Sequence, residues 1–300
     1  MTVLMATYNG VNYLTEQVES ILNQVDVNVH LVVSDDRSSD GTWERLVDWA
    51  VDDPRILLLP QINPSGGFAA NFYRLLCEAP LVDLVAFSDQ DDIWNTSKLA
   101  HQAAALRAAG CDGISSNVTA VAANGGRTLI RKSYPQRRLD YLFEAPGPGS
   151  TFVFTHRLAD TLRALLTDHN TPARAVQRHD WLTYAVCRAR GWRWRIEDTP
   201  WVDYRQHETN ALGANRGLHP ALERFQQLRN GTYRSEVLKI AGTVEPIATS
   251  SECAAIAHVE KLLHDRSIRS RRQLLAYIPE ARRRPRDRCI LATLVAAGLI

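Results

Sequence analysis

The stretch Ser88-Asp89-Gln90-Asp91-Asp92-Ile93-Trp94 follows directly after the apolar run Leu84 to Phe87. Three carboxylates within four residues at the end of a buried strand repel one another and resist desolvation. A divalent cation relieves that repulsion, and oxygen ligands suit Mg²⁺ or Mn²⁺, which can bridge to the phosphates of a nucleotide. The alternative is a solvated acidic loop in which Asp92 or Asn95 caps the next helix. Taken alone, the triplet favours that loop, so the rest of the chain must decide.

The first hundred residues alternate between short apolar runs and amphipathic segments. The apolar runs begin 26, 27 and 28 residues apart, at Val3 to Met5, Val29 to Val33, Ile56 to Leu59 and Leu84 to Phe87. Between them, residues 13–23, 42–51 and 68–77 place apolar side chains at helical spacing. Continuous apolar strands that alternate with such helices predict an α/β fold with a parallel sheet covered on both faces.

In open α/β sheets the ligand lies beyond the carboxyl ends of the strands. The first run continues into Ala6-Thr7-Tyr8-Asn9-Gly10 and the second into Ser34-Asp35-Asp36-Arg37-Ser38-Ser39-Asp40-Gly41, so polar groups converge with the acidic triplet at one edge. We expect Asp40 to cap the following helix, but capping does not also account for Asp35 and Asp36. The chain has no Gly-x-x-x-x-Gly-Lys-Ser/Thr loop and no complete dinucleotide fingerprint.

The charge of the chain, +2 overall, is unevenly distributed. Residues 1–135 carry 9 basic and 16 acidic side chains, whereas residues 136–300 carry 26 and 17. The acidic part is a poor anion binder without a metal, and the basic part suits an anionic acceptor or membrane surface. We expect no nucleic-acid partner. Five widely spaced cysteines, no signal peptide and a longest apolar run of 12 residues (289–300) predict a reduced, cytoplasmic protein.

Six short motifs, in order across residues 3 to 212, give the chain a specific resemblance. It resembles a family 2 glycosyltransferase of the GT-A fold, in the branch that includes bacterial rhamnosyltransferases of polysaccharide synthesis. The matching segments are Met5-Ala6-Thr7-Tyr8-Asn9-Gly10, Val33 to Thr42, Phe87 to Trp94, Pro148-Gly149-Ser150-Thr151, His179-Asp180-Trp181 and Tyr204-Arg205-Gln206-His207.

The resemblance implies a nucleotide site at the ends of the first two strands. Asp36 would bind the base or ribose, with Thr7, Asn9 and Asp35 beside it, and Asp89 would complete the nucleotide-binding set. Two positions depart from the family pattern: Thr7 replaces the usual proline before Tyr8-Asn9, and Arg37 replaces a common glycine. Neither departure removes a catalytic group, so we interpret both as variation of the donor pocket.

The resemblance also implies a metal site and a catalytic base. Asp89 and Asp91 match the Asp-x-Asp element, with Asp91 as the nearest ligand of Mg²⁺ or Mn²⁺ and Asp92 ambiguous. His207 matches a histidine that can complete the metal shell. Asp180 matches the carboxylate that deprotonates the acceptor hydroxyl. One such base suffices for a single in-line displacement, which inverts the anomeric configuration.

Each assignment has a structural alternative. Asp180 could be only the N-cap of a helix that ends at Gly191, and His207 could be a half-buried histidine without a ligand. If Asp180 is the base, we expect the helix N-terminus to keep it ionised. The aromatic residues from Trp192 to Tyr204 could stack on an acceptor sugar, but their period-two alternation favours packing in a strand pair.

We therefore predict a GT-A catalytic domain over residues 1–212 and a helical, basic extension over residues 213–300. Helices are expected over 221–228, 236–240 and 254–263, and residues 266–288 hold nine arginines against two acidic residues. The extension either packs on the catalytic domain or contacts the cytoplasmic face of the inner membrane, where a lipid-linked acceptor would lie.

The leading donor is dTDP-rhamnose, by branch resemblance alone, and the acceptor is a growing polysaccharide or lipid-linked glycan. A UDP-hexose such as UDP-galactose is the alternative donor. Two other classes remain open. A sugar nucleotidyltransferase also uses acidic metal ligands but would show a glycine-rich basic signature near the first strand. A non-catalytic carbohydrate-binding protein would need no carboxylate cluster.

Overall fold

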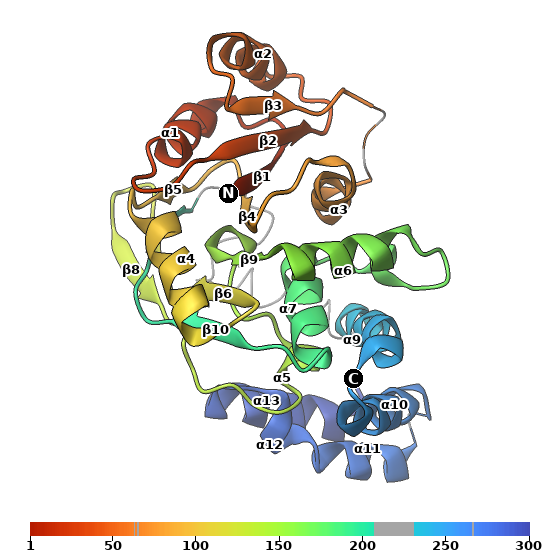
Figure 1. Cartoon of the computed structure of the whole chain (residues 1–300). Coiled ribbons are helices and arrows are strands. Elements are labelled where there is room, and N and C mark those ends of the chain that lie inside the picture. Colours follow the sequence, from red (N-terminus) through yellow and green to blue (C-terminus); the bar gives the residue numbers. More distant parts are fainter. Residues whose placement is uncertain (63, 65, 207–230, 266) are drawn as a thin grey trace.

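The computed structural model describes residues 1–206 and 231–300, except Asn63, Ser65 and Arg266. Two sheets form the centre of this part of the chain (Figure 1). In spatial order, the larger sheet contains β10 (Trp194–Glu197), β6 (Gly113–Ser116), β9 (Val153–Thr155), β4 (Leu84–Ser88), β1 (Thr2–Thr7), β2 (His30–Asp35) and β3 (Ile56–Leu58). The smaller contains β5 (Ile93–Trp94), β11 (Val202–Arg205), β7 (Val118–Val121) and β8 (Arg127–Ile130).

The larger sheet is parallel except for β9, which runs antiparallel to both β4 and β6. Its β1 to β4 cover the four predicted apolar runs, and the predicted α/β fold is confirmed. Successive side chains of β1 point to opposite faces, so Val3 and Met5 join one hydrophobic cluster and Leu4 joins the other. Burial on both faces is the reason that these strands read as continuous apolar runs.

Helices cover both faces of this sheet (Figure 1). The face of Val3 and Met5 is covered by α1 (Val11–Leu22), α2 (Thr42–Asp52) and α4 (Lys98–Ala109). The face of Leu4 is covered by α3 (Phe68–Glu78), α6 (His156–Thr167) and α7 (His179–Ala189). Short helices α5 (Asp140–Phe143), η1 (Gly149–Thr151) and η2 (Ala173–Ala175) lie in the connections.

Four sequence-based assignments are corrected by the structure. β10 and β11 belong to different sheets, because β10 pairs with β6 while β11 pairs with β5 and β7, so the predicted strand pair is wrong. The N-cap of α4 is Ser97 rather than Asp92 or Asn95. The N-cap of α7 is Arg178, which leaves Asp180 as the second helical residue. The N-cap of α2 is Gly41 rather than the expected Asp40, although Asp40 accepts the N–H of Thr42 at 3.1 Å.

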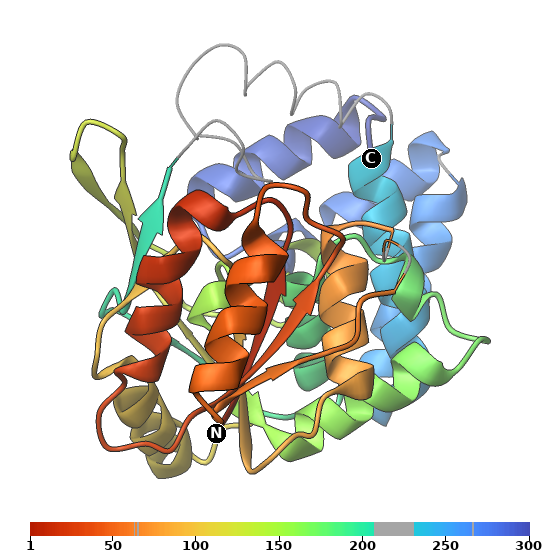
Figure 2. The ribbon, with the colours of Figure 1, turned by 90° about the horizontal axis from the view of Figure 1, so that it is seen from above.

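The C-terminal helices pack on the rest of the chain. They are α9 (Thr232–Val244), η3 (Glu245–Ile247), α10 (Ser250–Asp265), α11 (Ile268–Leu275), α12 (Ile278–Ala281) and α13 (Pro285–Ala296). Their apolar side chains, such as Ile240, Val259 and Leu291, belong to the same hydrophobic cluster as α6 and α7. They lie at the opposite end of the molecule from α2 (Figure 1 and Figure 2). The predicted boundary at 212–213 and the predicted helix 221–228 fall outside the described residues.

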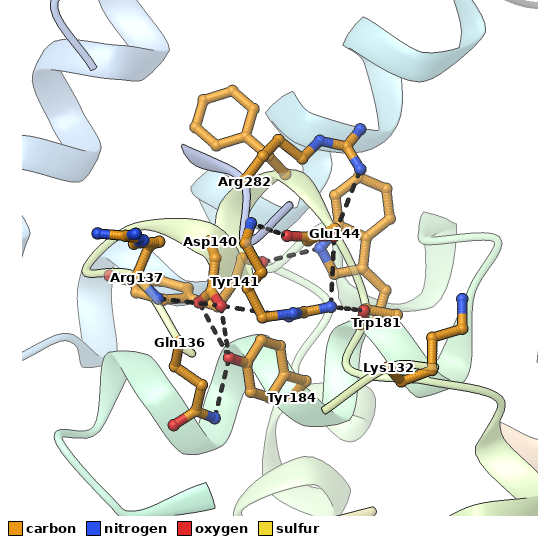
Figure 3. A network of polar contacts seen from close by, with 12 residues as sticks. Lys132, Gln136, Arg137, Asp140, Tyr141, Glu144, Trp181, Tyr184 and Arg282 are labelled. Atoms are coloured by element: carbon orange, nitrogen blue, oxygen red, sulfur yellow. Dashed lines mark hydrogen bonds and ion pairs between the residues drawn. The ribbon is translucent and has the colours of Figure 1, made fainter. Parts of the chain in front are cut away.

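A buried polar network fastens these helices to α7 (Figure 3). Asp140 of α5 is fully buried and accepts hydrogen bonds from Tyr184 at 2.9 Å, Arg188 at 3.2 Å and Arg283 at 3.2 Å. Arg283 also donates to the carbonyl of Ala145 at 2.5 Å. None of the described helices is long and apolar enough to span a bilayer.

Candidate active site

The loops after β1 and β2 are tied together through Asp35. This buried carboxylate accepts hydrogen bonds from Thr7 Oγ1 at 2.8 Å, from Ser38 Oγ at 2.5 Å and from Gln61 Nε2 at 3.1 Å. The Ser38 backbone N–H adds a further bond at 2.9 Å. Protein donors therefore contact both oxygens of Asp35, and it shapes the loop in which Asp36 lies.

Asn9 and Gln90 hold the loop after β1 from its two sides. Asn9 adopts a positive φ of 48° and accepts the Ser39 N–H at 2.8 Å. The Gln90 amide accepts the N–H of Tyr8 at 2.8 Å and donates to the carbonyl of Tyr8 at 2.9 Å. A Cβ on Gly10 would come within 2.3 Å of that amide, so a larger residue there would displace Gln90 from the backbone of Tyr8. This arrangement joins the first loop to the acidic stretch.

The acidic stretch turns at the carboxyl end of β4, where β5 of the smaller sheet begins. Arg205 of β11 fixes this turn, because its guanidinium donates to the carbonyl of Asp91 at 2.6 Å and to that of Tyr13 at 2.9 Å. Arg205 also forms an ion pair with Glu16. The motif Tyr204-Arg205-Gln206-His207 thus positions the acidic turn through its arginine, whereas His207 lies outside the described residues.

Two of the three carboxylates of this stretch, Asp89 and Asp92, lie in a desolvated environment, and Asp91 is half-buried. Burial raises the pKa of the Asp89 carboxyl well above its usual range, and neighbouring carboxylates raise it further, namely Asp92, Asp91 and Asp180. Burial, followed by the charge of Asp91, raises the pKa of Asp92 to about 8. Asp89 Oδ1 and both oxygens of Asp92 are buried and have no hydrogen-bond partner among the described residues.

Orphaned carboxylate oxygens of this kind fit a bound divalent cation, because such an ion removes both the repulsion and the desolvation cost. Asp89 and Asp91 carry carboxylate oxygens, the kind of ligand that Mg²⁺ and Mn²⁺ prefer, and could hold such an ion. Within residues 1–206 and 231–300, no group of three or more acidic, histidine or cysteine side chains gathers as a metal site. Two carboxylates nevertheless suffice for Mg²⁺ when substrate phosphates complete its shell.

Lys98 lies beneath the acidic turn, and the sequence did not single it out. It is fully buried, and its Nζ lies 3.5 Å from the centroid of the Trp94 ring. Burial lowers the pKa of Lys98 well below its usual range, while the charge of Asp92 opposes that shift. A lysine that begins an amphipathic helix normally faces water, so only the fold reveals this buried cation.

Asp180 lies at the start of α7 and close enough to Asp89 for the two charges to interact. Its Oδ1 accepts the Trp181 N–H at 2.7 Å. Burial raises the pKa of Asp180 above the ordinary carboxyl value, against the lowering effect of Arg178 and Lys132. Desolvation therefore sets the direction of this pKa shift, and the ionised state expected of Asp180 stays a prediction.

His179 forms the apolar support of this region. Its ring stacks on Phe72 at a centroid distance of 3.8 Å and meets Phe87 edge-on at 4.8 Å. Burial lowers the pKa of His179 to about 3, which keeps the ring neutral. A Cβ on Gly149 would lie 2.5 Å from His179 Nε2, so the motif Pro148-Gly149-Ser150-Thr151 packs directly against the motif of Asp180.

The sheet order fixes the spacing between the two halves of the site. Asp36 follows β2 and Asp89 follows β4, with β1 between them. Two strand spacings give a separation of about 10 Å across the edge of the sheet. A nucleoside diphosphate can span such a distance with its nucleoside at Asp36 and its phosphates at Asp89. The structure thus places five of the six motifs at one edge and leaves only the end of the sixth undescribed.

The GT-A class of transferases has a mostly parallel sheet with one antiparallel strand. It also has an acidic turn at the end of a central strand, as this chain has after β4. Residues 2–180 match the model of the family described as Glycosyl transferase family 2. A relative from Shigella flexneri, the dTDP-rhamnosyl transferase RfbG, is 37% identical over 243 residues, which cover 80% of this chain and 84% of RfbG. The chain belongs to glycosyl transferase family 2 and is a glycosyltransferase, as the motifs predicted.

Solved structures support the fold. TarS from S. aureus in complex with UDP-GlcNAc gives a TM-score of 0.62 at 16% identity, covering 99% of this chain and 87% of the TarS chain. The mannosyltransferase PcManGT from Pyrobaculum calidifontis, in complex with GDP-Man and Mn²⁺, gives a TM-score of 0.54 at 20% identity, covering 100% of this chain and 80% of that one. These likenesses confirm the predicted GT-A fold.

Proposed function

We propose that this chain is an inverting glycosyltransferase that moves a rhamnosyl group from dTDP-rhamnose to a hydroxyl of a growing bacterial polysaccharide or lipid-linked glycan. The observation that carries this proposal is the similarity to RfbG, a dTDP-rhamnosyl transferase, along most of both chains. The similarity extends well beyond the half that binds nucleotides in this fold, so it includes the side on which an acceptor would lie.

Asp180 is the proposed catalytic base. It is the carboxylate that α7 brings to the edge of the sheet beside Asp89, and burial raises its pKa toward the range in which a base accepts a proton effectively. Trp181, the next residue, donates through Nε1 to the carbonyl of Tyr141 at 2.8 Å and so fixes this turn of α7. Proton removal by one carboxylate supports a single displacement with inversion.

Asp36 is the proposed contact for the donor nucleoside, within the loop that Asp35 and Asn9 shape. Mg²⁺ or Mn²⁺, held by Asp89, Asp91 and the donor diphosphate, would neutralise the charge that develops on the leaving nucleoside diphosphate. His207 is proposed to complete that shell. Gln90 and Arg205 contribute by holding the backbone of the acidic turn in place.

A donor-binding experiment tests this proposal. The melting temperature of the protein should rise with dTDP-rhamnose in the presence of Mg²⁺ or Mn²⁺, since a ligand that binds only the folded state stabilises it. The rise should exceed that with UDP-galactose or UDP-glucose at the same concentration, and Asp36→Ala should abolish it. Equal shifts with all three donors, or none with dTDP-rhamnose, would contradict the proposed donor.

A UDP-hexose donor is the second candidate. The UDP-Glc-dependent glucosyltransferase WfaP from Escherichia coli is 29% identical over 102 residues, which cover 34% of this chain and 39% of WfaP. A larger thermal shift with UDP-glucose or UDP-galactose than with dTDP-rhamnose would favour this candidate.

We further propose that the enzyme acts in the cytoplasm and that its C-terminal extension contacts the inner membrane. Ile268 and Ile290 are 68% and 47% exposed, and exposed arginines such as Arg269 and Arg286 lie beside them in sequence. Basic and apolar side chains together bind anionic interfaces. Binding of the full-length protein to anionic vesicles should fall as salt rises, and an absence of binding at low salt would reduce the extension to a packing role.

A further inference from the structure

A cleft of about 690 Å³ lies apart from the acidic turn, along the edge strand β10. Its wall is formed by residues that precede β6, by Arg188 of α7, by residues 192–196 along β10 and by five residues of the segment 131–136. β10 runs parallel to β6, and β9 runs antiparallel to both β6 and β4, so β4, β6 and β10 all point the same way. Asp89 follows the carboxyl end of β4. The cleft residues Cys111 and Arg193 instead precede the amino ends of β6 and β10, so the cleft lies toward the opposite edge of the sheet.

The charge of the cleft is positive. Four arginines line it, Arg131, Arg188, Arg193 and Arg195, and none of the described lining residues is acidic. Arg188 is committed to Asp140 within the buried network. Arg195 lies 3.6 Å from Glu197, and the guanidinium of Arg193 makes no hydrogen bond or ion pair within the part of the chain that the structure describes. Both arginines lower the pKa of Cys111, although burial dominates and raises it.

Two half-buried aromatic side chains, Trp192 and Tyr134, line the cleft. Trp194 also belongs to its lining but is only 4% exposed, because its ring packs on Gly113 and its Nε1 donates to Ser115 at 3.0 Å. The guanidinium of Arg157 lies 4.2 Å from the centroid of the Trp192 ring, and Arg131 lies 5.0 Å from that of Tyr134. The aromatic side chains are thus held before any ligand arrives, which lowers the ordering cost of binding.

We propose that this cleft binds an anionic saccharide, a sugar that carries phosphate or carboxylate groups, at a site separate from the donor site. Guanidinium groups bind phosphate and carboxylate in a bidentate manner, and flat aromatic surfaces suit the apolar faces of sugar rings. The volume lies within the range of sites for small ligands. This inference does not depend on which donor the enzyme uses.

The test is a calorimetric titration of the full-length protein with glucose 1-phosphate, with methyl glucoside and inorganic phosphate as comparison ligands. Glucose 1-phosphate should bind at least about tenfold more tightly than either, since only it engages both the arginines and the aromatic wall. Arg193→Glu and Arg195→Glu should each weaken that binding by about tenfold or more. Arg45→Glu, the same charge change on an exposed residue of α2, should leave it within about twofold.

The donor site and the membrane provide the decisive controls. Asp91→Ala, which removes the proposed metal ligand for the donor phosphates, should leave binding of glucose 1-phosphate unchanged, and a loss there would place the ligand in the donor site and overturn the proposal. A measurement of binding to anionic vesicles distinguishes a site for a soluble ligand from a site for a lipid headgroup. If Arg193→Glu and Arg195→Glu abolish vesicle binding but leave glucose 1-phosphate binding intact, the arginines serve a membrane surface and the proposal is wrong. Each variant must melt within a few degrees of the wild type, and Arg193→Gln replaces any charge reversal that does not.

Discussion

Replacing Arg283 with methionine should lower the free energy of unfolding by about 3 kcal/mol, the lower part of the range for breaking a buried ion pair. Arg283 is 4% exposed, and its guanidinium bonds Asp140 at 3.2 Å and the carbonyl of Ala145 at 2.5 Å. The variant leaves Asp140, which is fully buried, with one cation fewer. Arg188 and Tyr184 still contact that carboxylate, so the loss should not reach the upper end of the range.

Urea unfolding followed by tryptophan fluorescence measures this loss as a lower midpoint at unchanged slope. Arg284→Met is the matched control, because the neighbouring Arg284 is exposed and contacts only the face of Tyr134, at 5.1 Å, among the contacts described. Arg284→Met should lower the free energy of unfolding by no more than about 0.5 kcal/mol. Combining Arg283→Met with Asp140→Asn should show a coupling energy of about 1 kcal/mol or more. Equal stability of the two single arginine variants would refute the reasoning.

Three further predictions concern the site. Asp180→Asn should reduce the transfer rate by about 10² to 10⁴ while donor affinity and melting temperature stay near wild type, and wild-type turnover would return Asp180 to a structural role. The difference in free energy of unfolding between wild type and His179→Gln should shrink by about 1.4 kcal/mol per pH unit as the pH falls from 6 to 4. The reason is that the unfolded histidine takes up a proton near pH 6.5 and the folded one only near pH 3. Urea unfolding midpoints across that pH range measure this difference, and a constant difference would contradict the prediction. Chelation or Asp91→Ala should abolish donor turnover in a folded protein, and undiminished transfer in excess chelator would exclude the metal bridge.

The regular half of the fold was predictable from sequence because burial on two faces leaves a clear pattern. Each of β1 to β4 is an apolar run, and each of α1 to α3 shows one apolar stripe, so the elements and their order follow from periodicity. The acidic turn was predictable for a different reason. The triplet alone favours a solvated loop, but polar residues also follow the first two strands and therefore meet it at one edge of the sheet.

The rest depends on contacts between residues far apart in the chain. Gln90 and Arg205 hold the acidic turn through backbone atoms of Tyr8 and Asp91, and nothing in their own surroundings in sequence indicates this. The pKa of Asp180 depends on how deeply α7 is buried, which sequence spacing does not reveal. Likewise, composition alone does not show that Arg283 in the basic segment points inward.

The network around Asp140 has a consequence for engineering hybrid enzymes. Glu144, four residues after Asp140, accepts the N–H of Arg283 at 2.6 Å, and Tyr233 donates to the carbonyl of Phe143 at 2.7 Å. These two partners of the C-terminal helices lie 90 and 139 residues earlier in the chain. A graft that exchanges only residues 231–300 with a relative would separate these pairs. An exchangeable unit must therefore be discontinuous and must include α5 together with the C-terminal helices.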